Sequence, residues 1–320
     1  MLRCAVLDDY QNAARSFGDW NSLAGKIDLQ VFNDFIAGRE ALVSALADFE
    51  IVVAMRERSR FDRELFDRLP TLKLLITTGM VNAAIDMDAA ADHGVTVCGT
   101  SGSVGSTAEL TWGLILALMR HIPAEHAEVR RGGRWQTSIG RELRGRQLGV
   151  IGLGKLGARV ARVALAFEMN VVAWSQNLTA ERCAEAGVRL ANSLDELLGT
   201  SDVVSLHLVL SDRTRGLIGA RELGLMKPGA ILINTSRGPL VDEASLVAAL
   251  KEKRIFAGLD VFDQEPLPAT HPLRSFDNVV ITPHLGYVTE ETYRIYYSGV
   301  VEDIAAWLAG KPVRVIRAPS

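Results

Sequence analysis

The sequence is short of the features that mark disulfide-rich, metal-binding and membrane-spanning chains. Its 320 residues include three cysteines, Cys4, Cys98 and Cys183. They stand too far apart for the paired spacing of a zinc site or a disulfide framework. No apolar run approaches the roughly 20 residues that a membrane-spanning helix needs, and the N-terminus runs directly into a strand pattern. We therefore expect a cytoplasmic protein with no metal site, export signal or membrane segment.

An excess of charge of one sign is also missing. Lys and Arg total 35 against 38 for Asp and Glu, giving a formal net charge of -3. The basic residues are scattered, whereas binding a phosphate backbone requires a basic stripe. Nucleic acid is therefore not expected as a partner. Hydrophobic residues make up 48% of the chain, a globular balance, and the length exceeds one ordinary core, which favours two domains.

Short runs rich in Val, Ile and Leu alternate with helical segments along the chain. Such alternation is typical of right-handed βαβ units and parallel sheets. One series fills the first hundred residues and another begins near residue 147, so two consecutive α/β domains are predicted. The runs are CAVLDD, LQVFND, FEIVVAM, LKLLIT and VTVCG, then QLGVIGLG, NVVAWSQ, DVVSLHL, AILINTS, FAGLDVF and NVVITPH.

Two apolar-periodic stretches define the expected domain boundaries. The first, AELTWGLILALMRHIPAEHAEVRRGG from Ala108, predicts one long helix crossing between the domains, with the Gly- and Ser-rich TSGSVGST before it as a hinge. The second predicts a helix over 289–308 that Gly310 and Pro312 end. We expect it to return the chain to the first domain. Residues 1–101 and 288–320 would then form one discontinuous domain, and residues 102–287 the other.

A glycine-rich motif follows the first strand of the second series. The predicted strand at 148–151 leads into Gly152-Leu153-Gly154-Lys155-Leu156-Gly157 and then into a helix. Gly152 allows a tight turn, Gly154 lets a pyrophosphate approach bare backbone, and Gly157 allows close packing of helix on strand. The phosphate would sit on the helix N-terminus, where free N–H groups and the helix dipole favour negative charge. In this context the motif predicts a dinucleotide site.

The end of the next strand bears on the choice between NAD and NADP. NAD-dependent proteins place an acid about 20 residues beyond the first glycine, on the ribose 2′-hydroxyl. This chain has Ser175, Gln176 and Asn177 there. No carboxylate would repel a 2′-phosphate, and no arginine stands immediately alongside to attract one, Arg182 being the nearest. Both cofactors therefore stay open.

Three further predicted strand ends carry polar residues: Arg237 in NTSRG, Glu265 in LDVFDQEP and His284 in VVITPHLG. The carboxyl ends of strands in such sheets face the ligand crevice. Reducing a 2-keto acid needs a proton donor, which suits an imidazole, and a cation for the carboxylate, which suits a guanidinium fork. Glu265 would accept a hydrogen bond from the imidazole and favour its protonated form. Singly each residue could be structural; together, after a dinucleotide motif, they favour hydride transfer.

These residues lie in long motifs that resemble the D-isomer-specific 2-hydroxyacid dehydrogenase family. The resemblance implies NAD(P)-dependent hydride transfer to a small D-2-hydroxy or 2-keto acid, such as glyoxylate, hydroxypyruvate or a phosphoglycerate-like acid. It also implies two Rossmann-like or flavodoxin-like parallel-sheet domains, an active-site cleft between them, and a homodimer formed through the cofactor domain. The length leaves no room for the regulatory domain of many phosphoglycerate dehydrogenases, which favours the reductases. The motifs are TAEL, GLGKLG, SLHLVLSDRT, MKPGAILINTSRGPLVDE, AGLDVFDQEP and ITPHLGY.

The resemblance also assigns roles to individual residues. Arg237 would bind substrate, and Glu265 with His284 would form the acid–base pair. Asp260 would contact the nicotinamide carboxamide, and His207 would line the cofactor cleft. Other cofactor contacts are expected at Thr107, Gly152, Gly154, Lys155, Leu156, Gly157, Ser175, Gln176, Thr214, Thr235, Ser236 and Gly286. Substrate contacts are expected at Arg56 and at the backbone of Val81 and Asn82, in a loop that departs from the family's glycine-rich pattern.

Two other functions stay open at this point. A nicotinamide-sensing corepressor resembling the same family would use the cofactor as a conformational ligand. The complete set of Arg237, Glu265 and His284 disfavours a pure sensor. A formate dehydrogenase also resembles these enzymes but needs no acid–base proton transfer, so Glu265 argues against it.

Overall fold

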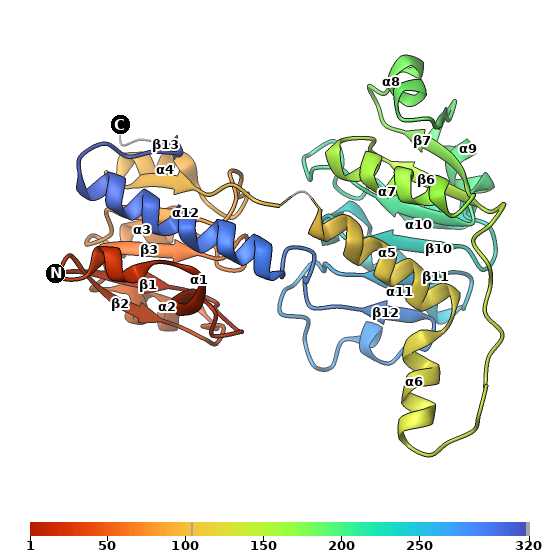
Figure 1. The fold of residues 1–320 in the computed structure, drawn as a ribbon, viewed down its shortest axis with the longest axis horizontal. Coiled ribbons are helices and arrows are strands. Elements are labelled where there is room, and N and C mark those ends of the chain that lie inside the picture. The colour runs from red at the N-terminus through yellow and green to blue at the C-terminus, as the bar shows by residue number, and fades with distance from the viewer. Residues whose placement is uncertain (104, 318–320) are drawn as a thin grey trace. The chain divides into compact units, whose positions relative to one another are not determined.

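The computed structural model describes residues 1–103 and 105–317, which fold into two compact units (Figure 1). The first unit comprises Met1–Ser103 and the chain from Val288 onward, and the second comprises the intervening chain up to Tyr287. The sequence predicts domain boundaries at residues 101/102 and 287/288, and the first unit of the structure runs on to Ser103. Residue 104 of the predicted hinge and residues 318–320 of the predicted first domain lie outside the described residues.

The first unit is built on a six-stranded sheet with the order β13-β5-β4-β3-β1-β2. Strands β1 to β5 are parallel in the flavodoxin-like order 2-1-3-4-5, and β13 adds an antiparallel edge. The mainly apolar strands β3, β4 and β5 are buried along their whole length because helices cover both faces of the sheet. The strands are β1 Leu2–Val6, β2 Ile27–Val31, β3 Ile51–Ala54, β4 Leu74–Thr77, β5 Thr96–Gly99 and β13 Val315–Arg317.

Three helices of the first unit, α3, α4 and α12, begin at side-chain caps that the sequence supplies. Asp62, Asp86 and Thr289 each accept the backbone N–H three residues on, which satisfies a free donor of the first turn. Helix α12 begins after Thr289 and packs on α1, as the periodicity over 289–308 predicts. The elements are α1 Ala14–Phe17, η1 Trp20–Leu23, α2 Arg39–Leu46, α3 Arg63–Asp67, α4 Met87–Asp92 and α12 Glu290–Leu308.

The second unit contains a seven-stranded sheet with the order β12-β11-β10-β9-β6-β7-β8, in which every pairing is parallel. The strand order reverses at β6 and β9, where ligands of open α/β sheets bind. The strands are β6 Gln147–Ile151, β7 Asn170–Trp174, β8 Arg189–Leu190, β9 Val203–Leu206, β10 Ile231–Asn234, β11 Phe256–Leu259 and β12 Val279–Ile281.

Helices cover both faces of this sheet, and each face has its own hydrophobic core. Helices α5 and α7 contribute to one core, and α9, α10 and α11 to the other (Figure 1). Among the described residues, no helix combines the length and apolarity needed to cross a membrane. The elements are α5 Ser106–Met119, α6 Ile122–Arg130, α7 Lys155–Ala166, α8 Ala180–Glu185, α9 Leu194–Thr200, α10 Ala220–Leu225, η2 Gly238–Leu240, α11 Glu243–Lys251 and η3 Pro272–Arg274.

The predicted long helix from Ala108 is wrong, because the stretch forms two helices. Helix α5 ends at Met119 and α6 starts at Ile122. Between them His121 takes a left-handed conformation with a φ of 53°. Pro123, in the first turn of α6, lacks the N–H that a continuous helix would need. The apolar periodicity runs across this break and conceals it.

Two strands were not predicted from the sequence. Strand β8 pairs only Arg189 and Leu190 with β7, and β13 joins only at the edge of the first sheet. Segments of two or three residues are too short to show an alternating pattern. Their strand conformation depends on the neighbouring strand that offers hydrogen bonds.

Candidate active site

The glycine motif forms a tight turn directly after β6. Gly152 has a φ of 97°, and a Cβ built on it would lie 2.5 Å from the carbonyl oxygen of His207. A Cβ on Gly157 would collide with the carbonyl oxygen of Gly152. These two positions therefore require glycine to let α7 pack against the turn. Gly154 differs, because a Cβ there would meet no atom within 4 Å.

The N-terminus of α7 suits an anionic group. Gly154 caps the helix without a side chain, and no acidic residue lies in the first turn. The first N–H groups and the positive end of the helix dipole are therefore available to phosphate. Lys155 is exposed beside them. The open space at Gly154 and this uncapped helix end fit the pyrophosphate of a dinucleotide.

The carboxyl end of β7 lies next to the glycine turn. Gly152 donates its N–H to the carbonyl of Trp174 over 2.9 Å, so Ser175 follows directly beside the turn. Ser175 is half-buried and Gln176 is exposed. Arg182 is 62% exposed and lies 3.8 Å from Glu185. Hydroxyl and amide groups therefore follow β7, and their contact with the adenosine ribose stays a prediction.

His207 follows β9 on the other side of the glycine turn. Its Nε2 shares a 2.9 Å hydrogen bond with the Ser205 hydroxyl, and its buried Nδ1 has no partner among the described residues. Burial lowers the pKa of His207 to about 4. Burial therefore disfavours the charged form of this ring, the form that a general acid needs. Thr214 ties the same loop together by donating to the carbonyl of Val209 over 2.7 Å.

His284 and Glu265 form a hydrogen-bonded pair past the ends of β12 and β11. His284 Nδ1 lies 2.6 Å from Glu265 Oε2, and Glu265 Oε1 accepts the N–H of Phe262 over 2.9 Å. The histidine side chain is 14% exposed and the glutamate 25%. The His284 ring meets Tyr287 edge to face, with 5.4 Å between centroids. With Nδ1 held, Nε2 is the ring nitrogen available to a substrate.

Asp260 anchors the loop that carries His284. Its Oδ1 accepts the Thr282 hydroxyl over 2.5 Å and the Leu285 N–H over 2.7 Å. Its Oδ2 accepts the Gly286 N–H over 2.8 Å. Burial raises the pKa of Asp260, and these hydrogen bonds oppose the rise. The side chain is 0% exposed, so anchoring is its task here; a contact with the carboxamide stays a prediction.

The loop that carries Arg237 is shaped by Asn234 and packs against the loop of Glu265. The Asn234 amide donates to the carbonyl of Arg237 over 2.8 Å and accepts the N–H of Ser236 over 3.0 Å. Arg237 Nη1 donates to the carbonyl of Ser236 over 2.7 Å. A Cβ on Gly238 would collide with the carbonyl of Phe262. The Arg237 loop and the Phe262 backbone are therefore in direct contact.

Helix α5 joins the same edge of the sheet through threonine hydroxyls. Thr107 donates to the carbonyl of Gly286 over 2.9 Å. Thr111 shares a 2.9 Å hydrogen bond with Thr235, one turn further along the helix. The predicted cofactor residues Thr107, Thr235 and Gly286 are thus part of one bonded network.

The predicted substrate residues Arg56, Val81 and Asn82 lie in the first unit, past the ends of β3 and β4. Arg56 Nη1 donates to the carbonyl of Thr78 over 3.1 Å. The Asn82 amide donates to the carbonyl of Arg56 over 2.7 Å and to the Thr77 hydroxyl over 2.8 Å. Val81 is 69% exposed. The Asn82 side chain is therefore committed to holding the loop, which leaves its backbone for a ligand.

The second unit gathers all the predicted cofactor residues, Arg237 and the His284–Glu265 pair along the carboxyl edge of its sheet. Sequence reasoning missed the partners that hold them, namely Thr282, Thr111, Asn234 and the N–H of Phe262. Asn234, Phe262 and Thr282 lie in the same sequence motifs as Arg237, Glu265 and His284, but the motifs do not show which groups form hydrogen bonds. Only the four-residue spacing of Thr111 from Thr107 offered a signal, because residues four apart share a helix face.

A parallel sheet with a reversed strand order, a glycine turn, an open helix N-terminus and a paired histidine together define a class, the dinucleotide-dependent oxidoreductases. Comparison with known families specifies this class further. Residues 112–286 match the NAD binding domain of the D-isomer specific 2-hydroxyacid dehydrogenases. The chain belongs to this family.

Individual relatives are similar over most of the chain. It is 40% identical to the glyoxylate reductase of Aeropyrum pernix over 79% of this chain and 78% of that protein. It is 38% identical to the D-3-phosphoglycerate dehydrogenase of Methanocaldococcus jannaschii over 85% of this chain. The aligned segment spans only about half of that dehydrogenase, 52% of its length. The structure of a phosphoglycerate oxidoreductase from Vibrio cholerae superposes with a TM-score of 0.92 at 37% identity, covering 97% of this chain and 100% of that one.

The open space at Gly154 leads to a first prediction. Gly154→Ala should leave the melting temperature unchanged, because its Cβ meets no protein atom. It should weaken dinucleotide binding roughly tenfold or more, because the methyl group occupies the path of the pyrophosphate. Calorimetric titration with NAD and NADP, alongside thermal unfolding, measures both effects. Gly224→Ala, also in open space, serves as the control, and undiminished affinity in Gly154→Ala would contradict the assignment.

Proposed function

We propose that this protein is an NAD(P)-dependent D-2-hydroxyacid dehydrogenase that reduces a small 2-keto acid or oxidises the matching D-2-hydroxy acid. The observation that carries this proposal is the 2.6 Å hydrogen bond between His284 and Glu265. This bond leaves one imidazole nitrogen for substrate on the sheet edge that also holds the glycine turn. The family membership of the chain supports the same conclusion.

Each residue of the site has a defined part in this chemistry. A bound nicotinamide supplies or takes up the hydride. In reduction, His284 gives the proton on Nε2 to the carbonyl oxygen while C2 of the substrate gains the hydride, and oxidation reverses both transfers. Glu265 keeps the ring oriented through Nδ1. Arg237 grips the substrate carboxylate with its planar guanidinium.

For the substrate, we favour a short acid such as glyoxylate or hydroxypyruvate, with a phosphoglycerate-like acid as the larger alternative. The names of the similar glyoxylate reductase and phosphoglycerate dehydrogenase support this range. In the first unit, we propose that Arg56 and the backbone N–H groups of Val81 and Asn82 bind the acid. No described residue accepts a hydrogen bond from these two N–H groups.

The acid–base assignment gives the decisive test of function. Purified protein should oxidise NADH or NADPH with at least one member of a panel of short 2-keto acids. His284→Ala should lower turnover roughly 100-fold or more, the usual scale for losing a general acid. Cofactor affinity should barely change, because His284 does not form the glycine turn.

The other outcomes of that test are distinct. Cofactor binding without turnover on any 2-keto acid would favour a sensor and end the proposal. Formate-dependent reduction of NAD would identify a formate dehydrogenase instead. His126→Ala, on the exposed helix α6, controls for the loss of an imidazole elsewhere.

The cofactor preference depends on the residues after β7. We propose that the wild-type protein accepts both NADH and NADPH, since Ser175 neither repels a 2′-phosphate nor grips a 2′,3′-diol as a carboxylate would. Ser175→Asp should shift the ratio of kcat/KM toward NADH by roughly tenfold or more, because it adds that carboxylate. Steady-state kinetics with both cofactors measures the shift. Ser175→Asn, an uncharged variant of similar size at the same position, should change the ratio little. Equal ratios of kcat/KM in all three proteins would refute this role of Ser175.

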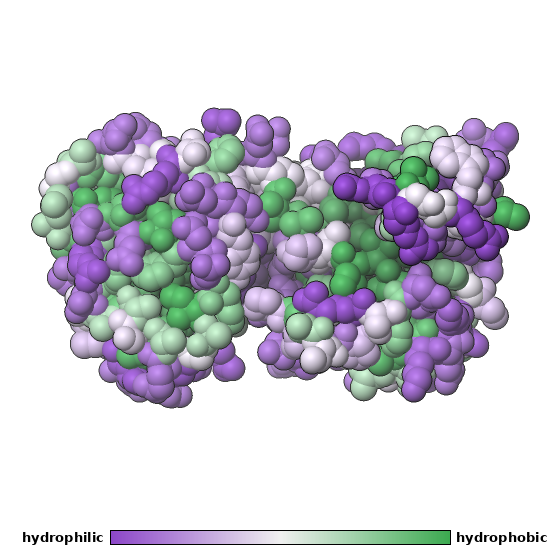
Figure 2. Space-filling view, turned by 90° about the horizontal axis from the view of Figure 1, so that it is seen from below, coloured by the Kyte–Doolittle hydropathy of each residue, from purple (hydrophilic) through white to green (hydrophobic). Residues whose placement is uncertain are grey.

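We also propose a homodimer formed through helix α6 and the loop that follows it. No residue of α6 is buried. Trp135 is 77% exposed and Ile139 94%. In the view from below in Figure 2, hydrophobic side chains are interspersed with hydrophilic ones, which is ordinary for a protein surface. Large exposed side chains on a segment with no core of its own favour a second copy as its cover.

Replacing the exposed side chains of Trp135 and Ile139 tests the proposed dimer. The Trp135→Ser/Ile139→Ser protein should sediment as a monomer at concentrations where the wild type is a dimer, because the substitutions remove apolar area from the contact. Val313→Ser, at another exposed site, should leave the oligomeric state unchanged. A wild-type monomer at micromolar concentration would refute the proposal.

We place the protein in the cytoplasm because its cysteines are free and buried, which cell fractionation would check.

A further inference from the structure

A second histidine–glutamate pair lies behind the candidate active site. Glu243 is the first residue of α11, and its Oε1 lies 3.1 Å from His271 Nε2. His271 Nδ1 accepts the N–H of Leu273 over 3.3 Å, so Nε2 carries the proton and donates to Glu243. The side chains are 28% and 16% exposed. Nothing in the proposed chemistry uses this pair.

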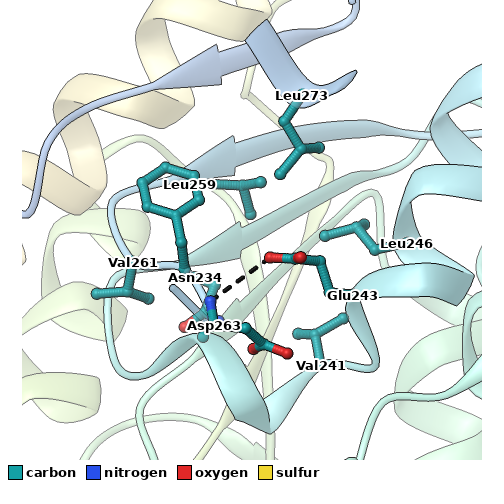
Figure 3. A pocket seen from close by; sticks show the side chains of 10 residues that line it. Asn234, Val241, Glu243, Leu246, Leu259, Val261, Asp263 and Leu273 are labelled. Atoms are coloured by element: carbon teal, nitrogen blue, oxygen red, sulfur yellow. Dashed lines mark hydrogen bonds between the residues drawn. The ribbon is translucent and has the colours of Figure 1, made fainter. Parts of the chain in front are cut away.

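Glu243 connects the two loops that carry the proposed catalytic residues. It ends the loop that starts at Arg237, and its Oε2 accepts the N–H of Asp263 over 3.5 Å. Figure 3 shows this contact as a dashed line from the Glu243 carboxylate to the Asp263 backbone. The next N–H back along the chain, that of Phe262, is the one that holds Glu265.

The space around Glu243 is too small for a metabolite. A cavity of about 10 Å³ lies there, lined by Asn234, Gly238, Glu243, Phe262 and Asp263 among others. Such a volume holds roughly one water molecule at most. The pair is therefore not a ligand site, which leaves a structural or positioning role.

The contacts favour positioning over general stabilisation. The Glu265 loop is otherwise braced at its far end, where Arg274 donates to the carbonyls of Leu267 and Pro268 over 2.6 and 2.9 Å. At its near end, the bracing consists of Gly238 against the Phe262 carbonyl and of Glu243 against Asp263 and His271. The Gly238 contact is steric, whereas the Glu243 carboxylate accepts directional hydrogen bonds. Glu243 can therefore favour one orientation of the Glu265 loop.

We propose that Glu243, with His271, is a positioning residue that holds the Phe262–Glu265 segment in register with the Arg237 loop. This inference rests on the proposed dehydrogenase function. Glu243 acts by fixing the Phe262 N–H, which in turn directs the Glu265 carboxylate at His284. A displacement of about 1 Å in such a constellation costs up to roughly 100-fold in rate.

Glu243→Ala should lower kcat by roughly tenfold or more while leaving cofactor affinity unchanged, since the glycine turn is remote in sequence and contact. In a Glu265→Gln background the same change should lower kcat less than about twofold, because the group it positions is already lost. Equal losses in both backgrounds would contradict the proposal. Glu243→Gln, which keeps an acceptor for His271, should recover part of the activity.

Asp242→Ala provides the matched control. Asp242 caps the same helix by accepting the N–H of Ser245 over 2.8 Å, so its loss weakens α11 without touching the Glu265 loop. It should lower the melting temperature and leave kcat nearly unchanged. A fall in kcat equal to that of Glu243→Ala would show a merely structural role. If Glu243→Ala does not fold, Glu243→Asp, whose carboxylate is one methylene shorter, takes its place in the same cycle.

Hydrogen exchange separates this inference from the proposed function. The amide of Phe262 should exchange faster in Glu243→Ala than in the wild type or Asp242→Ala, because its acceptor Glu265 is no longer held in place. Unchanged exchange would overturn the positioning role even in an active enzyme. Faster exchange in a protein inactive on every 2-keto acid would support the positioning role and refute the dehydrogenase.

Discussion

The candidate site depends on the alignment of parallel strands, which brings distant chain segments to one edge of a sheet. In the second unit, residues after β6, β9, β10, β11 and β12 meet there because neighbouring strands run in register. Residues as far apart as Gly152 and His284 therefore share one edge. The strand order reverses at β6 and β9, which is where ligands of open α/β sheets bind, and the glycine turn follows β6 at that edge.

Hydrogen bonds between loops convert this coarse alignment into a defined geometry. The proposed acid–base pair has a defined partner at each step: Glu265 holds His284, the N–H of Phe262 in the same loop holds Glu265, and Asp260 holds the His284 loop. These partners are themselves partly or fully buried, so water competes little for their hydrogen bonds. Two histidines of the unit illustrate the result, because burial lowers the pKa of His207 whereas His284 is paired with a carboxylate.

Much of the fold could be predicted from the sequence because its causes are local. Buried parallel strands need continuous runs of Val, Ile and Leu, which mark β3 or β10 without ambiguity, and Gly152 and Gly157 leave no room for a side chain. The prediction of one long helix was wrong because hydrophobic periodicity does not reveal a single residue in a left-handed conformation, here His121. Strands β8 and β13 were missed because their hydrogen bonds come from neighbours.

The sequence by itself determined the alternating strands, the glycine turn, and which residue types end the strands, since each follows from side-chain volume, polarity and spacing along the chain. Only the tertiary structure decided which partner holds each group. It commits the Asn82 amide to its own loop, buries Asp260 under the His284 loop, and sets Glu243 against His271. Such pairings depend on distances across separate segments, and no local pattern along the chain encodes those distances.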